Sequence, residues 1–449
     1  MTYTEDALVE QPAIQLFSDL NWETMTCWDE VFGSAFDLEN DESLANNPMF
    51  FGRETRNDVV LFARLRTALL KLNPDINKLI IQEAIDEIAR DRSAMTAIAA
   101  NEEVYELLTS GYVYTTNAED EDDCVVQYID WSDATNNDFL LCSQMSMTGE
   151  IETRRPDLIG FINGLPLIFI ELKASHKNLL SAYKNNLADY KNTIPKLFTY
   201  NQIIILSNGV QSKVGSISSQ WEHFAEWKKV ESEKEERRVS LEVVIRGVCE
   251  QNRLLDIIEN YTLYIKTKQT IKIIAKYHQY LGVNQALCGL NNVKERDGQL
   301  GVFWHTQGSG KSFSMVFFCK KAFRKYTGNW TFVLVTDRTD LDDQIYKTFN
   351  SAGIVTENCQ ADSGVQLKAL LGEDHRFVFT LIQKFKGDEK GNYPVLSERD
   401  DIIVITDEAH RSQYDSLAMN MRNAMPNASF MAFAYSHDFD HRFSSALIA

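Results

Sequence analysis

The chain has 449 residues, of which 44% are hydrophobic and 24% charged, and its formal net charge is −19. This length suffices for two or three domains with large cores, and the composition is ordinary for a soluble globular protein. No apolar run approaches the roughly 20 residues of a membrane span. The acidic N-terminus lacks a signal-peptide pattern. The seven cysteines include no Cys-x-x-Cys pair, which argues against a zinc site and predicts a reducing, cytoplasmic environment.

Helical patterns dominate the first quarter of the chain. Apolar side chains recur at helical spacing in residues 4–20 and again throughout residues 58–110, whereas residues 40–57 are Asn-, Asp- and Pro-rich and predict a loop. Strands are expected at 124–130 and 138–146. The helices would form an insertion in, or a flank of, the domain that follows.

The next stretch reads RPDLIGFINGLPLIFIELK, two apolar runs joined by an Asn-Gly pair that is typical of a hairpin turn. Glu171 and Lys173 alternate onto one face of the second run, and Asp157 opens the first. A strict two-residue turn would pair residue 157 with 170 and point Asp157 away from Glu171. We therefore expect a three-residue turn that pairs 157 with 169, or an equivalent bulge.

Two carboxylates beside a lysine suit metal-assisted cleavage of a phosphodiester. Asp157 and Glu171 would bind Mg²⁺, which activates a water molecule, and Lys173 would orient or deprotonate that water or offset negative charge. The set resembles the PD-(D/E)xK nuclease motif. The alternative is a surface hairpin with solvated ends, because Glu-x-Lys is a common sequence.

The elements after the hairpin agree with the nuclease hypothesis. A helix is expected at 179–190 and a strand at 202–207. Helix, three antiparallel strands, helix and strand is the αβββαβ core of PD-(D/E)xK nucleases. Two basic clusters predict local, salt-sensitive DNA binding despite the negative net charge. They are Lys173, His176, Lys177, Lys184 and Lys191, and Lys266, Lys268, Lys272 and Lys276.

A connecting region separates this domain from the next. Residues 221–238 are highly charged and predict a solvated helix or linker, and residues 240–265 predict a bridging pair of helices. We expect an endonuclease domain over 1–255 and an ATP-binding domain over 256–449.

The second domain is organised around the loop HTQGSGKS, residues 305–312, which follows a strand and precedes an apolar helix. Glycines in such a Walker A loop let backbone N–H groups surround phosphates at a helix N-terminus. Lys311 would reach the β- and γ-phosphates and Ser312 would bind Mg²⁺. His305 stands where the consensus has Gly, and a plain Gly-rich turn is the alternative. The other predicted ATP-binding residues of the loop are Thr306, Gly308, Ser309 and Gly310.

A Walker B pattern follows, an apolar strand at 402–407 that ends in Asp-Glu-Ala-His. Asp407 would hold Mg²⁺, and Glu408 would polarise the attacking water. Further apolar strands at 331–336 and 376–385 alternate with helices, which predicts a doubly wound, RecA-like parallel sheet with nucleotide at the strand carboxyl ends. An ordinary strand-end cap is the alternative for the two acids.

The motifs together resemble a known family. Asp-Glu-Ala-His, VTDRTDLDDQ and TLIQKF are similar to superfamily 2 helicase motifs. With a PD-(D/E)xK nuclease on the same chain, the sequence resembles the restriction (R) subunit, the motor and nuclease, of type I restriction–modification enzymes. The stretches FINGLPLIFIELK and WHTQGSGKS are similar to sequence motifs of that family, and the resemblance covers nearly all of the chain.

The resemblance implies further site residues and partners. Tyr190 matches the tyrosine of the family's Gln-x-x-x-Tyr motif and would belong to the catalytic set, although Asn186 stands in place of the glutamine. Gln279 matches the glutamine that contacts adenine. The implied cofactors are ATP and Mg²⁺. The implied partners are double-stranded DNA and the modification (methyltransferase) and specificity subunits, with no membrane.

The sequence departs from the family at its C-terminal end. After Phe433 the family continues Thr-Gly-Thr-Pro, whereas this chain reads Ala-Tyr-Ser-His. We therefore expect a truncated fragment that lacks the second RecA-like domain, binds ATP weakly and has little or no ATPase activity alone.

The leading hypothesis is ATP-dependent DNA translocation coupled to Mg²⁺-dependent cleavage of double-stranded DNA far from the recognition site. One alternative is an ATP-dependent nuclease–helicase of DNA repair or phage defence that acts without a methyltransferase. Another alternative, of a different class, is an inactive, nucleotide-gated DNA-binding scaffold.

Overall fold

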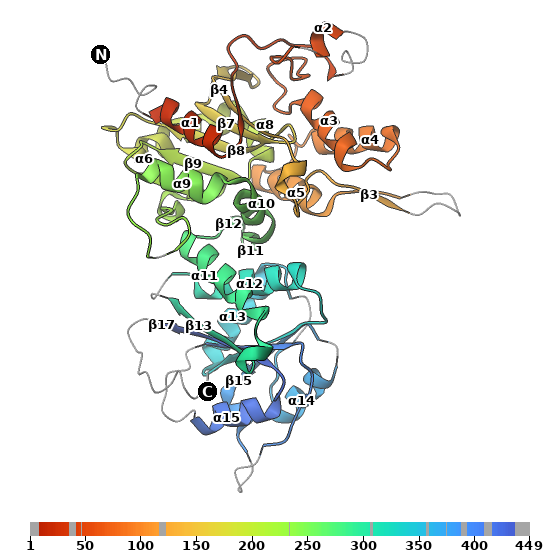
Figure 1. Cartoon of the computed structure of the whole chain (residues 1–449), viewed down its shortest axis with the longest axis vertical. Coiled ribbons are helices and arrows are strands. Elements are labelled where there is room, and N and C mark those ends of the chain that lie inside the picture. The colour runs from red at the N-terminus through yellow and green to blue at the C-terminus, as the bar shows by residue number, and fades with distance from the viewer. Residues whose placement is uncertain are drawn as a thin grey trace. The chain divides into compact units, whose positions relative to one another are not determined.

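The computed structural model describes residues 9–35, 42–45, 47–115, 123–232, 234–305, 309–355, 359–373, 375–387, 393–407 and 415–435. The chain divides into two compact units, one of residues 1–264 and 269–277 and the other of residues 265–268 and 278–449 (Figure 1). The first unit therefore continues past the boundary expected at residue 255. The reason is that helix α10 (Gln251–Asn260) buries its apolar side chains, including Leu254 and Ile258, in that unit.

The first unit is built on a six-stranded sheet of order β1-β4-β7-β8-β9-β10. β4, β7 and β8 are antiparallel, and β9 runs parallel to β8 after an intervening helical segment, so the expected helix–strand order is present. β1, which the sequence did not predict, runs parallel to β4 at the edge. The strands are β1 (Glu23–Thr26), β4 (Phe139–Ser143), β7 (Leu158–Ile162), β8 (Leu165–Leu172), β9 (Ile203–Ser207) and β10 (Ser212–Gly215).

Helices cover both faces of this sheet (Figure 1). α1 (Gln11–Asp19) and α9 (Ser240–Cys249) lie on one face, where Phe17 contacts Trp22 with ring centroids 5.1 Å apart. α7 (Ala188–Thr193) and α8 (Pro195–Tyr200) lie on the other, where Phe169 of β8 packs 5.3 Å from the rings of both Tyr190 and Phe198. Because strand side chains alternate, Glu171 shares the α7 face with Phe169.

The remaining elements of the first unit refine the predictions. The helices expected within 58–110 are confirmed, and the expected pair at 240–265 ends at Asn260 and gives way to a β-hairpin. The described residues of 221–238 form a linker that includes one 3-10 turn. The strand at 124–130 is shorter than expected and pairs outside the main sheet. These elements are α3 (Phe62–Leu72), α4 (Lys78–Ala89), α5 (Ala97–Ser110), β2 (Tyr112–Tyr114), β3 (Cys124–Val126), η5 (Trp221–His223), β11 (Thr262–Lys266) and β12 (Thr270–Ile274).

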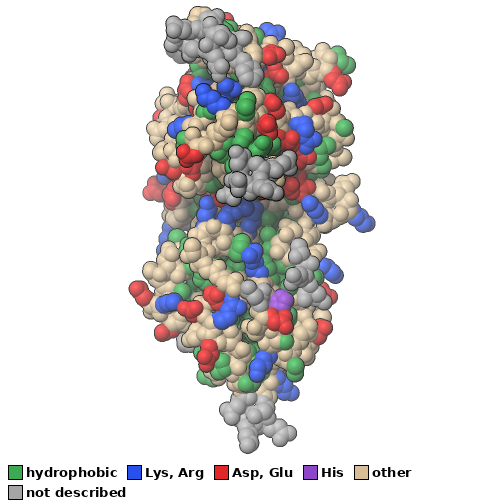
Figure 2. All heavy atoms as spheres, turned by 90° about the vertical axis from the view of Figure 1, so that its right-hand side faces the viewer, with side chains coloured by type: hydrophobic (Ala, Val, Ile, Leu, Met, Phe, Trp, Pro, Cys, Tyr) green, Lys and Arg blue, Asp and Glu red, His purple; other side chains and the backbone are tan. Residues whose placement is uncertain are grey.

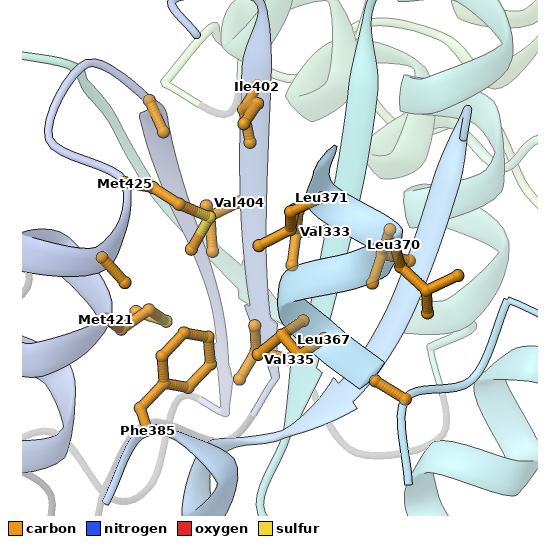
Figure 3. Packing of buried hydrophobic residues seen from close by; sticks show 14 of the residues in the cluster. Val333, Val335, Leu367, Leu370, Leu371, Phe385, Ile402, Val404, Met421 and Met425 are labelled. Atoms are coloured by element: carbon orange, nitrogen blue, oxygen red, sulfur yellow. The ribbon is translucent and has the colours of Figure 1, made fainter. Parts of the chain in front are cut away.

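The second unit contains a five-stranded parallel sheet of order β13-β17-β16-β14-β15. α14 and α15 pack on one face, where Leu367 and Met421 meet Val333 and Val404 (Figure 3). α12 packs on the other face through Phe318 against Phe332, so the predicted doubly wound sheet is confirmed. The elements are α11 (Tyr277–Leu290), β13 (Gln299–His305), α12 (Lys311–Lys325), β14 (Thr331–Thr336), α13 (Thr339–Ser351), α14 (Gly364–Gly372), β15 (Phe377–Leu381), β16 (Ile402–Asp407), α15 (Asp415–Ala424) and β17 (Ser429–Tyr435).

Within the described part of the chain, no helix combines the length and apolar character needed to cross a membrane.

Candidate functional site

The β7–β8 hairpin closes with a two-residue turn. Ile162 pairs with Leu165, and Asn163 and Gly164 both have positive φ, 50° and 78°. This is the geometry that an Asn-Gly pair favours, because both residues tolerate left-handed backbone. Of the two expected arrangements, the three-residue turn is wrong and the bulge is present. The turn is held from inside the unit, since the Leu61 amide donates to the Gly164 carbonyl oxygen at 2.8 Å.

A β-bulge in the same hairpin shifts the strand register so that Asp157 and Glu171 can share a face, which the two-residue turn alone would not allow. Gly160 pairs with Ile168 and Phe161 with Pro166, which leaves one extra residue on β8. The pairing then runs to Leu158 and Ile170, so the next position places Asp157 opposite Glu171 rather than opposite residue 169. The prediction that Asp157 shares a face with Glu171 is confirmed, through the bulge. Directly opposed residues have Cβ atoms about 4.5–5.5 Å apart.

Hydrogen bonds fix all three predicted nuclease residues. The Leu172 amide donates to Asp157 Oδ2 at 2.7 Å, and Lys173 Nζ donates to Glu171 Oε1 at 2.6 Å and to the Leu172 carbonyl oxygen at 3.0 Å. Glu171 is only 1% exposed. The ammonium group of Lys173 offsets the cost of burying this carboxylate.

This donor set fits a hard divalent cation. Two carboxylates on adjoining strands supply oxygen ligands, and Mg²⁺ typically takes one or two carboxylates and keeps several waters. The described residues contain no group of three or more His, Cys, Asp or Glu side chains placed to hold a metal. A cation here would therefore depend on water, backbone or substrate oxygens for its remaining ligands.

Tyr190 lies beside the two carboxylates. Its hydroxyl donates to the Arg155 carbonyl oxygen at 3.2 Å, two residues before Asp157. Burial, followed by the charges of Glu171 and Asp157, raises the pKa of Tyr190, so the hydroxyl stays protonated and remains a donor. The helix that carries it contains a π-helical turn over residues 182–187, which includes Asn186, and such turns are frequent at functional sites. Tyr190 thus positions the strand that presents Asp157.

Of the lysines expected in the basic clusters, Lys272 is buried and Lys191 is half-buried. Lys191 Nζ donates to the Ile217 carbonyl oxygen at 2.7 Å, and burial lowers the pKa of Lys191 to about 8. Lys272 is 1% exposed, and burial lowers its pKa well below the usual range. The prediction that Lys272 belongs to a DNA-binding surface is wrong, and the Nζ of Lys191 is engaged by the Ile217 carbonyl oxygen. The other members are at least partly exposed, and the face shown in Figure 2 has acidic and basic side chains interspersed.

The second candidate site lies at the carboxyl ends of the parallel strands. Gly310, with φ 91°, precedes α12, and Lys311 begins that helix. Lys311 Nζ donates to Asp407 Oδ1 at 2.5 Å, and both side chains are buried. The structure thus brings together the predicted Walker A lysine and Walker B aspartate, 96 residues apart in the chain. Thr306, Gly308 and Glu408 lie outside the described residues.

Gln279 contacts the phosphate loop itself. Its Nε2 donates to the Gly310 carbonyl oxygen at 3.0 Å and to Ser314 Oγ at 3.3 Å, and the neighbouring His278 Nε2 lies 3.3 Å from the Ser309 carbonyl oxygen. Its role toward adenine stays a prediction, as does that of the half-buried Ser312 toward Mg²⁺. Sequence reasoning missed Ser314, although it lies one helical turn after Gly310.

Two family models match the chain. Residues 2–223 match the type I restriction enzyme R protein N terminus, and residues 278–435 match the SWI2/SNF2 ATPase. The two matches fall on the two units described above.

The curated relatives of the chain include endonuclease subunits of type I restriction enzymes. The chain is 35% identical to the type I restriction enzyme HindI endonuclease subunit of Haemophilus influenzae over 95% of its own length. It is 25% identical to the SauCOLORF180P endonuclease subunit of Staphylococcus aureus over 70% of its length. It spans 42% and 33% of the lengths of these relatives. Among solved structures, the DNA-bound type ISP restriction–modification enzyme LlaBIII shows 13% identity and a TM-score of 0.26, covering 90% of this chain and 22% of that one.

Proposed function

The chain belongs to the family of type I restriction enzyme endonuclease (R) subunits, and we propose that it carries the DNA-cleaving site and the first ATP-binding domain of such a subunit. Its second unit is a RecA-type SNF2 ATPase domain. Because the chain spans 42% of the first relative's length, the activity of the whole protein is part of the proposal.

The first unit is proposed to be a PD-(D/E)xK nuclease that cleaves double-stranded DNA. Asp157 and Glu171 would hold Mg²⁺, which when bound supplies an activated water and offsets charge on the scissile phosphate. Lys173 would release Glu171 Oε1 and hold or accept a proton of the attacking water. Tyr190 would keep Asp157 in place through the Arg155 carbonyl oxygen.

The second unit is proposed to bind ATP at Lys311 and Asp407. Lys311 Nζ lies 2.5 Å from Asp407 Oδ1, so both side chains are within reach of one phosphate-bound metal site. ATP would draw Lys311 to its β- and γ-phosphates and leave Asp407 for Mg²⁺. Ser309, Gly310 and Ser312 would contribute the remaining phosphate and metal contacts from the described part of the loop.

We further propose that ATP drives DNA translocation in the complete subunit and that cleavage occurs far from the recognition site. Modification and specificity subunits of the same complex would recognise the DNA sequence, and the complex would act in the cytoplasm. The observation that carries the nuclease assignment is the bulge that places Asp157 opposite Glu171, with Lys173 bonded to Glu171.

The test is Mg²⁺-dependent nicking of plasmid DNA by the complete subunit, reconstituted with its partner subunits, with and without ATP. Glu171→Ala is compared with the wild type and with Glu222→Ala, a matched change at an exposed position. Cutting that requires ATP and Glu171 supports the proposal. Cutting that ignores ATP indicates an independent nuclease, and equal cutting by Glu171→Ala contradicts the nuclease assignment.

A further inference from the structure

We propose that Trp28 and Arg155, stacked at the rim of the Asp157–Glu171 site, form a contact for the DNA strand that enters this site. The proposal rests on the proposed nuclease function and assigns a substrate-binding role to two residues outside the carboxylate–lysine set.

The stack is unusual because a large aromatic side chain is left open to solvent. Trp28 is 59% exposed, and the Arg155 guanidinium lies over its indole ring, 3.9 Å from the centroid. The guanidinium also donates to Ser146 Oγ, at 3.1 Å from Nη2 and 3.3 Å from Nε. Within the described ranges, no ion pair joins Arg155 to a carboxylate. A fixed but uncompensated guanidinium matches the geometry of a phosphate.

A buried arginine holds both sides of the stack in place. Arg53 is 0% exposed and binds both carboxylate oxygens of Glu30, at 2.8 and 2.9 Å. Its Nη2 also donates to the Ser146 carbonyl oxygen at 2.9 Å. Glu30 lies two residues after Trp28, and Ser146 is the residue that Arg155 contacts, so Arg53 fixes the two supports at once. The stack is therefore built before any ligand arrives, which reduces the entropic cost of binding.

The position of the stack relates it to the carboxylates. Arg155 precedes Asp157 by two residues on the chain segment that enters β7. The carbonyl oxygen of Arg155 accepts a hydrogen bond from the hydroxyl of Tyr190. The charges of Glu171 and Asp157 help to raise the pKa of that hydroxyl, so both carboxylates lie near it. A phosphate that meets Arg155 thus belongs to a strand whose neighbouring phosphates can reach the carboxylates.

The chemistry of the pair points to nucleic acid as the ligand. Ser146 Oγ takes the Nε–Nη2 edge of Arg155, and the Nη1–Nη2 edge can bind a phosphate oxygen pair. An exposed indole face stacks on an unpaired base or a deoxyribose. The two together recognise a DNA backbone whose base has left the duplex stack, as occurs where a strand is distorted for cleavage. The contact needs no base sequence, because every base offers a stacking face.

The experiment measures DNA affinity without cleavage. The 449-residue chain is titrated in EDTA against a fluorescent duplex and a fluorescent single strand of about 30 nucleotides, at several salt concentrations. Arg155→Ala should weaken binding about tenfold and lower the salt slope by about one. Trp28→Ala should weaken single-strand binding about tenfold, and Trp28→Phe should restore most of it. The DNA affinity of Arg155→Lys should lie between those of the wild type and Arg155→Ala, because lysine keeps the charge but not the planar fork.

Matched controls separate this role from a structural one. Arg237→Ala and Leu79→Ala change an exposed arginine and an exposed apolar side chain in the same unit and should bind DNA as the wild type does. Melting temperatures of all variants should agree, because Trp28 and Arg155 are exposed. Arg155→Ala binding DNA like Arg237→Ala would overturn the proposal. So would intact DNA binding with weakened capture by the modification and specificity subunits, which would make the stack a protein interface. Lost affinity in the stack variants, with cutting retained by Glu171→Ala, would keep the contact and reject the nuclease assignment.

Discussion

In the first unit, Lys173 and Lys272 each hydrogen-bond to buried groups, but the groups are of different kinds. At the end of β8, Lys173 bonds to the carboxylate of Glu171. In β12, Lys272 donates to neutral oxygens only, Asn101 Oδ1 at 3.0 Å, the Asn201 carbonyl at 3.3 Å and Gln202 Oε1 at 2.6 Å. A carboxylate keeps a lysine charged, whereas burial among neutral groups favours the uncharged amine.

The difference separates a site for chemistry from a structural support. Lys173 and Glu171 can exchange partners for a metal and a substrate, because they lie at the end of β8, where Lys173 is partly exposed. Lys272 fills the space between α5 and the start of β9, where Asn101, Asn201 and Gln202 offer acceptors to its Nζ, so it stabilises the fold. The same residue type, partly exposed at 173 and fully buried at 272, is thus expected to affect chiefly activity in the first place and stability in the second.

Substitution of Lys173 is the strongest way to test this difference. We expect Lys173→Ala to lower the rate of plasmid cleavage by the reconstituted complex about 10³-fold, because the proton carrier beside the water is lost. Its melting temperature should fall as well, because Glu171 loses the cation that offsets its burial, so cleavage is compared at a temperature at which both proteins are folded. Lys177→Ala, an exposed neighbour, is the control. Full cleavage by Lys173→Ala would mean that Lys173, like Lys272, has only a structural role.

Substitution of Lys272 should have the reverse effect. Lys272→Met leaves acceptors of Asn101, Asn201 and Gln202 without their donor, so we expect the free energy of unfolding to fall by about 4 kcal/mol. Urea denaturation at neutral pH measures this change, with the exposed Lys268→Met as control. Stability equal to that of the control would mean that the hydrogen bonds of Lys272 contribute nothing net.

Lys191 extends the comparison to pH. Its folded pKa of about 8 lies below the unfolded value near 10.4, so the unfolded state binds more protons between these values and stability rises with pH there. Relative to Lys191→Met, the wild type should gain roughly 3 kcal/mol between pH 7 and pH 11. Parallel urea titrations of wild type, Lys191→Met and the exposed Lys184→Met measure it. A difference independent of pH would show that Lys191 is charged in both states.

The nucleotide site offers the smallest expected change. Lys311, like Lys173, is paired with a carboxylate, so Lys311→Ala should weaken ATP binding about tenfold by removing one charge-assisted contact. Calorimetry with the 449-residue chain and Mg-ATP measures the affinity, and Lys325→Ala in the last turn of α12 is the control. Unchanged affinity in Lys311→Ala would contradict the phosphate-loop assignment.

Local patterns in the sequence determined the elements and the motif residues. Alternation along β8 predicted that Glu171 and Lys173 share a face, and the Gly-rich loop predicted a helix over 313–323, which the structure extends back to Lys311. These features depend on residues only a few positions apart, whose spacing directly sets the direction of each side chain. The parallel order of strands in the second unit likewise follows from alternating strand and helix patterns.

Only the tertiary structure decided how distant segments meet. The bulge that places Asp157 opposite Glu171, the burial of Lys272 and the stacking of Arg155 on Trp28 each join segments that no local pattern links. A lysine in an exposed helix and one aimed into a core look alike in sequence, because the neutral oxygens that receive it come from elsewhere in the chain. Packing of the whole unit selects among such alternatives, since buried polar groups must find partners wherever the fold brings them.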